Sequence, residues 1–162
     1  MRTTAILTAV FLALATAAIA VEQPRLIPRS ARIDRPVEQV FDTLKQYFSG
    51  PSLSMFNLVS ADRKNGTIVA RRAGIDTAHW TDWAFCEAEP MKMIYKFEDG
   101  TATVTVKVEA SGNNRTFASV TADFQGTYGL ASSENKIACV SKGSLEENIL
   151  AVARGAASHP SN

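Results

Sequence analysis

The sequence predicts an α+β fold: two amphipathic helices, one near each end of the chain, packed on one face of a curved antiparallel sheet of about six to seven strands. Three observations support this prediction. Apolar residues recur at helical spacing over residues 37–48. Residues 103–109 and 118–124 alternate between apolar and polar side chains, which is typical of antiparallel strands with one face in water. A second amphipathic segment begins at Ser144 and fades by Gly155.

Residues 1–20 have the features of a signal peptide. Arg2 precedes an apolar run over residues 5–15, and small residues follow at Ala18 and Ala20, which is a pattern that signal peptidase accepts. The run is shorter than the roughly 20 apolar residues of a membrane-spanning helix. We therefore expect cleavage before Val21 and a periplasmic or secreted protein. Because no cysteine follows the cleavage point, we expect no stable membrane anchor in the mature protein.

The charges of the chain are nearly balanced, with 17 Lys and Arg residues against 16 Asp and Glu residues. Cleavage of the signal peptide removes one base and no acid, which leaves 16 of each. This balance argues against nucleic-acid binding, which needs a clustered basic excess. We expect a single domain over residues 30–155, with an irregular lead-in over 21–29 and a disordered tail over 156–162.

The first part of the domain is predicted to form a strand, a helix and a hairpin. Asp34 is expected to cap the helix, and Pro36 fits its first turn, which has no hydrogen-bond donor to lose. Gly50 is expected to end the helix in a left-handed conformation. An Asn-Gly pair at residues 65–66 indicates a tight turn between two strands. The expected strands are Ser30–Ile33, Met55–Ser60 and Thr67–Arg72.

The second part is predicted to complete the sheet and add the last helix. Residues 98–100 are expected to turn the chain, and Gly126 and Gly129 to mark a bulge or a loop. Ser144, with Glu147 three residues later, forms a capping-box pattern at the start of the last helix. The remaining expected elements are a loop over Gly74–His79, a turn over residues 111–114, and strands over Trp80–Glu87, Met93–Phe97, Thr103–Glu109, Arg115–Phe124 and Asn135–Val140.

Cys86 and Cys139 are the two cysteines of the chain. In an exported protein such a pair usually forms a disulfide, and this one would close a loop of about 53 residues and staple the two halves of the domain. The alternative is a free catalytic thiol, which requires a nearby base, and only His79 is suitable. We therefore predict the disulfide.

The segment around His79 is the expected loop richest in functional side chains. Trp80 and Trp83 suggest a contact surface, because tryptophan is enriched at binding hot spots; filling of the core is the alternative for them. A metal site would need at least three converging ligands, which consecutive loop residues rarely supply, so no metal is predicted. Arg71 and Arg72 form a basic hairpin suited to an anionic partner, with a solvated sheet edge as the alternative.

Residues 141–144 place two serines beside a turn. No Gly-x-Ser-x-Gly motif surrounds Ser141 or Ser144, so capping and turn formation explain them better than nucleophilic catalysis does. We therefore assign no catalytic residue and no cofactor.

The strand before Asp34 and the helix start through Phe41 resemble the opening of helix-grip domains. These include lipid-transfer START and polyketide-cyclase-like proteins and the repeated domains of an outer-membrane assembly lipoprotein. In the ligand-binding members a long C-terminal helix closes a cavity. Here the last helix has only about three turns before Gly155, so the likeness is greater to the smaller assembly-lipoprotein type.

A second resemblance involves Cys86 and the motif Cys-x-Ser-x-Gly-x-Leu-Glu at residues 139–146. This combination is similar to a group of uncharacterised small bacterial envelope proteins, many of them lipoproteins, in which a strand cysteine is matched by the late motif. The hairpin around residues 60–70 is similar to theirs as well. The resemblance implies an envelope location and a disulfide, and it assigns no catalytic residue.

These observations predict a non-enzymatic, periplasmic protein that binds a protein or an envelope component. One alternative is a carrier of a lipid or another apolar small molecule, held between the first helix and the sheet. Another is a small periplasmic hydrolase or thiol enzyme. An enclosed apolar cavity of several hundred Å³ would favour the carrier, whereas a core filled by five residues would exclude it: Phe41, Phe48, Val104, Val106 and Phe124.

Overall fold

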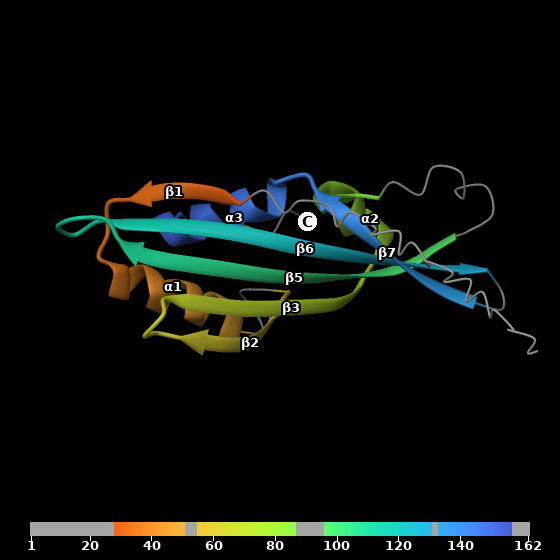
Figure 1. The fold of residues 1–162 in the computed structure, drawn as a ribbon, viewed down its shortest axis with the longest axis horizontal. Helices are drawn as coiled ribbons and strands as arrows, with labels where there is room; N and C mark the ends of the chain where they lie inside the picture. Colours follow the sequence, from red (N-terminus) through yellow and green to blue (C-terminus); the bar gives the residue numbers. More distant parts are fainter. Residues whose placement is uncertain (1–27, 51–54, 87–95, 131–132, 157–162) are drawn as a thin grey trace, which may run out of the picture.

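The structure, a computed structural model, describes residues 28–50, 55–86, 96–130 and 133–156. It confirms the α+β class, with a seven-stranded antiparallel sheet and three helices within these residues (Figure 1). The elements are β1 (Arg29–Ile33), α1 (Val37–Ser49), β2 (Asn57–Asp62), β3 (Thr67–Ile75), α2 (Thr77–Trp83), β4 (Ala84–Phe85), β5 (Lys96–Ala110), β6 (Thr116–Leu130), β7 (Ser133–Ser141) and α3 (Ser144–Arg154).

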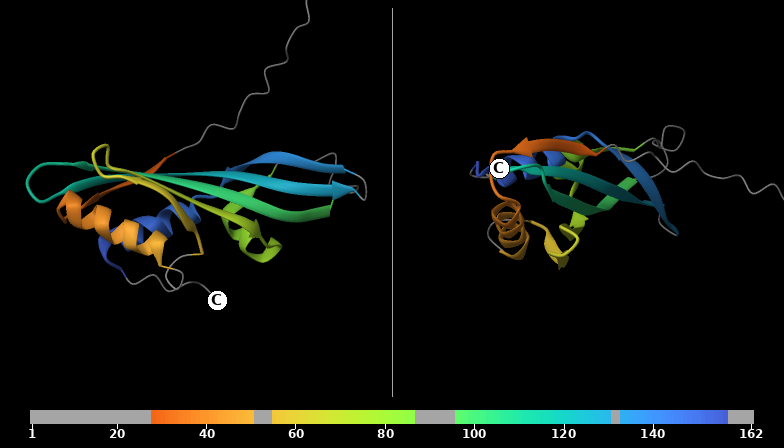
Figure 2. Two further views of the ribbon diagram at one scale, coloured as in Figure 1. Left: turned by 90° about the horizontal axis from the view of Figure 1, so that it is seen from below. Right: turned by 60° about the vertical axis from the view of Figure 1, so that its left-hand side comes forward.

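The sheet has the strand order β2-β3-β5-β6-β7-β4, and β1 pairs with β6 outside this path. The β5–β6 hairpin of two 15-residue strands forms its long axis. One edge of β6 pairs with β1 over residues 116–120 and with β7 over residues 124–130, so β1 and β7 follow one another along the same edge. All three helices lie on one side of the sheet (Figure 2).

The core lies between this face of the sheet and the helices. Alternation along β5 and β6 turns every second side chain inward, because successive residues of a strand point to opposite faces. Alanines at several inward positions are small enough for the helices to pack closely. The buried residues of these elements include Val40, Phe41, Leu44 and Phe48 of α1; Ala102, Val104, Val106 and Val108 of β5; Ala118, Val120, Ala122 and Phe124 of β6; and Leu145, Ile149, Leu150 and Ala153 of α3.

The segment between β3 and β5 differs from its prediction. β3 continues to Ile75, and a short helix, α2, replaces most of the loop expected over Gly74–His79 and most of the strand expected over Trp80–Glu87. A strand would turn Trp80 and Trp83 to opposite faces, whereas one helical turn places both on the same face. Within the described residues, only Ala84–Phe85 is left as strand, and it pairs with β7.

The glycines of the long hairpin also have a different role from the predicted one. The chain does not turn at residues 98–100, because β5 passes through them with a register shift between Phe97 and Asp99. A Cβ atom at Gly100 would overlap the ring of Trp80, so glycine is needed there for close packing. Gly126 and Gly129 lie within β6 rather than in a loop. The turn expected over residues 111–114 is confirmed, with positive φ at Gly112 and Asn114.

The predicted helix caps are only partly correct. α1 begins after Pro36 with no side-chain cap, and Asp34 instead pairs with Arg115 at 2.9 Å. Gly50 is extended at φ −92°, not left-handed. The capping box at Ser144 is also wrong: it is the first helical residue, its hydroxyl donates to a carbonyl in α2, and Gly143 with φ 88° precedes the helix. Gly155 ends α3 at φ 87°, as expected.

Several sequence predictions concern residues outside the described part of the chain. These are the signal peptide over residues 1–20, the lead-in through residue 27, residue 87 and residues 93–95 of two expected strands, and the tail over 157–162. Arg29, expected in the lead-in, is the first residue of β1.

Arg35 connects the two long helices to the sheet. Its guanidinium donates to the carbonyl of Ala153 in α3 at 3.0 Å and to the hydroxyl of Thr43 in α1 at 3.1 Å. Its own carbonyl accepts a hydrogen bond from the Thr116 hydroxyl in β6 at 2.7 Å. A cation at the end of α3 also interacts favourably with the helix dipole.

Replacing Arg35 with alanine should therefore lower the free energy of unfolding by about 1–3 kcal/mol, since charged hydrogen bonds are lost. The matched variant Arg32→Ala, at an exposed position of β1, should change it by less than about 0.5 kcal/mol. Urea unfolding of both variants measures the difference. Equal losses in the two variants would show that the contacts of Arg35 contribute nothing specific.

Candidate functional site

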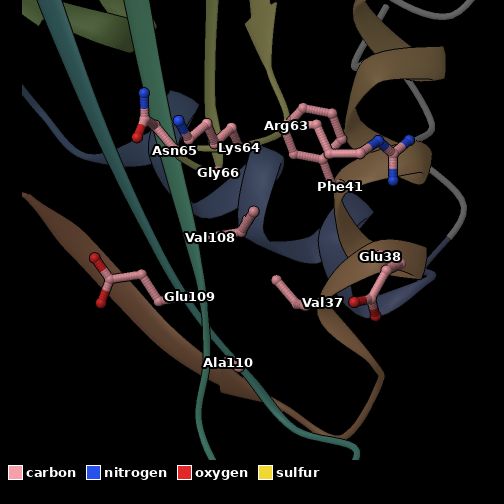
Figure 3. A pocket seen from close by; sticks show the side chains of 10 residues that line it. All are labelled: Val37, Glu38, Phe41, Arg63, Lys64, Asn65, Gly66, Val108, Glu109 and Ala110. Atoms are coloured by element: carbon pink, nitrogen blue, oxygen red, sulfur yellow. The ribbon is translucent and has the colours of Figure 1, made fainter.

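A groove of about 410 Å³ lies between the start of α1, the turn joining β2 to β3, and the end of β5 (Figure 3). Its floor is apolar. Val37 and Val108 point toward one another across it, and Phe41 lies beside them. Phe41 and Val108 are each 3% exposed, so these side chains present only a limited surface to the groove. The complete lining is Val37, Glu38, Phe41, Arg63, Lys64, Asn65, Gly66, Val108, Glu109 and Ala110.

The turn at Gly66 forms one wall of the groove. Gly66 has φ 61°, and its carbonyl accepts a hydrogen bond from the Val108 amide at 2.8 Å. A Cβ atom at this position would overlap the carbonyl oxygen of Val108. The Asn-Gly pair that predicts a turn from sequence therefore also brings the turn against β5, because only glycine permits so close an approach.

Replacing Gly66 with alanine is expected to lower the free energy of unfolding by more than the same change at Gly74. Both glycines have positive φ, but a Cβ atom at Gly74 would meet nothing within 4 Å. Gly74→Ala should thus show only the left-handed backbone cost of about 1–2 kcal/mol. Gly66→Ala should lose about 1 kcal/mol more through the strained contact and hydrogen bond at Val108. Urea unfolding and amide exchange at Val108 test this difference, and equal losses would contradict it.

Asp62 and Asn65 stabilise the same turn. The Asp62 carboxylate accepts from the Asn65 side-chain amide at 2.7 Å and from its backbone N–H at 3.1 Å. These bonds, the side-chain one first, lower the pKa of Asp62 below its usual value. The turn therefore keeps its shape at neutral pH with Asp62 ionised.

Four charged side chains line the groove, two acidic and two basic. Arg63 lies over the Phe41 ring, 4.9 Å from its centroid, and forms an ion pair with Asp42 of α1. The Arg63 cation thus already has an aromatic and an acidic partner. Glu38 lies on α1 beside Val37, whereas the carboxylate of Glu109 points away from Val37 and Val108 (Figure 3), because neighbouring residues of a strand point to opposite faces of the sheet. The arrangement suits a ligand with an apolar part and attached charges rather than a wholly apolar one.

The tryptophans predicted as a contact surface lie in the core instead. Trp80 is 4% exposed and Trp83 is 8% exposed. The Trp80 ring packs with Phe97 and Phe124 at centroid distances of 5.3 and 5.5 Å. The alternative stated for these residues, filling of the core, is therefore the correct one.

Arg71 and Arg72 do not form one basic surface. They are neighbours on β3, so their side chains point to opposite faces of the sheet. Arg71 is exposed on the face without helices, opposite Thr103 of β5. Arg72 lies on the helical side, with its guanidinium 5.6 Å from the centroid of the Trp83 ring. The structure thus brings Arg72, His79 and Trp83 together and leaves Arg71 apart from them.

His79 is held by the residue that caps its own helix. Asp76 accepts from the His79 backbone N–H at 2.9 Å, and the imidazole Nδ1 lies 2.9 and 3.0 Å from the two carboxylate oxygens. These contacts, the backbone bond first, lower the pKa of Asp76. Within the described residues, no three His, Cys, Asp or Glu side chains are grouped as metal ligands would be.

The depressed pKa of Asp76 predicts an acid-sensitive helix. Its carboxylate contributes stability above the unfolded-state pKa of about 4, and this contribution is lost as the pH falls through the lower folded-state value. The stability difference between the unmodified protein and Asp76→Asn that is due to this carboxylate should therefore begin to shrink near pH 4 and be lost only below the lowered folded-state pKa. Carboxyl NMR titration of the folded protein should show a pKa of Asp76 below the ordinary aspartate value of about 4, and titration at the ordinary value would refute the prediction.

The two cysteines lie at disulfide distance, with Sγ atoms 2.06 Å apart. Cys86 follows β4, and Cys139 lies in β7 next to the strand pair of β4 and β7. Backbone and side-chain bonds support the same junction: Lys142 N–H donates to the Trp83 carbonyl at 2.8 Å, and the Ser144 hydroxyl donates to the Asp82 carbonyl at 2.6 Å. The predicted clasp between the two halves of the domain is present.

The other residues of the motif at 139–146 also have structural roles. The Ser141 hydroxyl donates to the carboxylate of Glu146 at 2.8 Å and accepts from the Gly143 amide at 2.9 Å. Glu146 is 1% exposed and Leu145 is 4% exposed. These contacts show that the motif forms the junction between β7 and α3. Turn formation, the role predicted for Ser141, is therefore consistent with its hydrogen bonds.

No protein-family model matches this chain, and no curated protein is similar to it. Among solved structures, a TBP-like protein from Parabacteroides distasonis is similar over 68% of this chain, at 9% sequence identity and a TM-score of 0.36. The similar region covers 64% of that protein. Within the described residues, none of the helices is sufficiently long and apolar to span a membrane.

The groove has no signal in the sequence that would have identified it. Its three parts are separated by more than twenty residues each, and they meet only because β3 pairs with β5 and α1 packs behind the hairpin. The Asn-Gly turn and the helix start are each visible in the sequence, but neither predicts the other as its neighbour.

Proposed function

We propose that this protein is exported to the periplasm and acts there without catalysis, by binding a segment of another protein in the groove between α1, the β2–β3 turn and β5. The observation that carries the proposal is the combination of an apolar floor and charged residues of both signs in one open depression. Binding sites commonly pair a mostly apolar surface with a few polar groups that set orientation.

The shape of the groove favours a protein segment over a small apolar molecule. Val37 and Val108 give the groove an apolar floor, and the charged residues Glu38 and Lys64 also line it. A peptide presents both apolar and polar groups, and recognition by a few side-chain anchors is common in peptide-binding grooves.

The alternative functions have less support. The five residues expected to fill the space beneath the first helix are all buried, at 3% exposure or less, which argues against a large lipid cavity there. A thiol enzyme would need a free cysteine, and both cysteines of the chain are at bonding distance from one another. The carrier would regain support if the purified protein retained lipid.

A pair of identical substitutions tests the groove. Val37→Arg places a long cation in the groove, and Val59→Arg places the same residue on β2, where the valine is 61% exposed and does not line the groove. Tagged protein purified after export of the full chain is incubated with envelope extract, and bound proteins and lipids are identified by mass spectrometry. Thermal unfolding confirms that both variants are folded.

The expected result is a protein captured by the unmodified chain and by Val59→Arg, and lost with Val37→Arg. Capture that survives Val37→Arg would place binding elsewhere. Recovery of lipid alone would favour the carrier.

A further inference from the structure

The turn between β2 and β3 contains an Asn-Gly bond, which is open to spontaneous deamidation. The backbone nitrogen of Gly66 can close a five-membered ring on the side-chain amide carbon of Asn65, and glycine has no Cβ atom to obstruct this approach. Asn65 is exposed, so water can complete the reaction. Both residues line the groove (Figure 3), so the reaction would change one of its walls.

The reaction replaces the amide of Asn65 with a carboxylate. The Gly66 nitrogen loses its proton and attacks Asn65 Cγ; a C–N bond forms, and the bond from Cγ to Nδ2 breaks as ammonia leaves with a proton. Water then adds to either carbonyl carbon of the resulting succinimide ring. Opening at Cγ gives aspartate. Opening at the backbone carbonyl carbon gives isoaspartate, in which the main chain passes through the former side chain and gains a methylene group.

Both reacting groups are held by other hydrogen bonds in the folded protein. The side-chain amide of Asn65 donates to the Asp62 carboxylate at 2.7 Å, and the Asn65 backbone N–H donates to the same carboxylate at 3.1 Å. The Gly66 N–H donates to the Arg63 carbonyl at 3.3 Å. Ring closure requires the nitrogen and the amide carbon to meet in an aligned geometry, so these bonds must be released first.

We propose that Asn65 is a site of deamidation which the fold protects through Asp62, and that conversion of Asn65 to isoaspartate opens the turn. The new carboxylate cannot donate to Asp62, and two neighbouring carboxylates disfavour one another. The longer main chain of isoaspartate also displaces Gly66, whose carbonyl accepts from the Val108 amide at 2.8 Å. This wall of the groove is therefore altered whether or not the groove binds a protein segment.

Deamidation rates in three proteins test the protective role of Asp62: the unmodified protein, Asp62→Ala and Asp123→Ala. Each is incubated at mildly alkaline pH, and peptide mass spectrometry follows the conversion of Asn65 and Asn114. Asp123 is an exposed acid on β6, and Asn114 is exposed and precedes arginine rather than glycine, so both serve as controls. The unmodified chain in urea gives the rate without the fold.

The expected result is that Asn65 deamidates about tenfold faster in Asp62→Ala than in the unmodified protein, because hydrogen bonds to a charged group are lost. Asp123→Ala should leave this rate unchanged, and Asn114 should react equally slowly in all three folded proteins. The chain in urea should react at least as fast as Asp62→Ala. Equal rates at Asn65 in the folded and the urea-unfolded chain, or in Asp62→Ala and the unmodified protein, would overturn the protection.

The isoaspartate form tests the opening of the turn. It is separated by chromatography after incubation and identified by electron-transfer fragmentation. Its Val108 amide should exchange with solvent about tenfold faster than in the unmodified protein, whereas the amide of Val104, farther along β5, should not change. Asn65→Asp keeps the ordinary main chain and should show a smaller increase at Val108. Unchanged exchange at Val108 in the isoaspartate form would contradict the opening of the turn.

Discussion

Removing the disulfide by changing both Cys86 and Cys139 to serine is expected to lower the free energy of unfolding by about 4 kcal/mol. The bond joins residues 53 positions apart, so its loss restores a large amount of conformational freedom to the unfolded chain. The loss is large relative to the usual total stability of about 5–15 kcal/mol for a domain. Urea unfolding of the oxidised protein, the reduced protein and the double variant measures it.

Two comparisons make this result specific. Reductant should lower the unfolding midpoint of the unmodified protein and leave that of the double variant unchanged. A loss below about 1 kcal/mol would mean that the hydrogen bonds between α2, β4 and the start of α3 hold this junction without the disulfide. Alkylation of both thiols without reductant would show that the bond does not form.

Replacing Trp80 with alanine is expected to lower the free energy of unfolding by about 3–5 kcal/mol, as for other large buried aromatic residues. Its ring packs against Phe97, Phe124 and the backbone of Gly100, and its indole N–H donates to Cys86 Sγ at 3.4 Å. Truncation would therefore leave a cavity where α2 meets the sheet. Thermal and urea unfolding provide the measurement.

An exposed apolar residue provides the control for Trp80. Val59→Ala, at a side chain that is 61% exposed, should change the stability by less than about 0.5 kcal/mol. If Trp80→Ala were equally mild, the tryptophan would belong to the surface, and the contact surface first predicted from the sequence would have to be restored.

The two long helices and the β5–β6 hairpin could be predicted because their signals are local and repeated. Six apolar residues between Val37 and Phe48 follow one helical face, and four of them are buried. Alternation over residues 103–109 likewise turns three valines inward. Such periodic patterns reflect burial directly, so the structure follows them.

The structure of residues 74–86 and 96–100 could not be predicted correctly, because it depends on distant partners. α2 is short and has too few residues to show a helical pattern. Gly100 suggests a turn when considered alone, but Trp80 occupies the space beside it in the fold. Local propensity is overridden here by tertiary packing.

The cysteine motif and the groove lie toward opposite ends of the sheet. The clasp at β4, β7 and the start of α3 lies near α2, whereas the groove lies at the end of β5 beside the β2–β3 turn (Figure 1). The cysteines, the nearby serines and the two tryptophans are the most conspicuous features of the sequence. All of them have contacts in the structure that stabilise the fold. The proposed binding residues are individually ordinary and are brought together only by strand pairing.

Photo-cross-linking in the intact envelope tests the proposed site of binding most directly. A photoreactive residue is placed at Glu38 in the groove or at His79 on α2, in the otherwise unmodified chain. A covalent adduct with another protein is predicted from position 38 and not from position 79. An adduct from position 79 with none from position 38 would contradict binding in the groove. The binding site would then lie on the surface around α2.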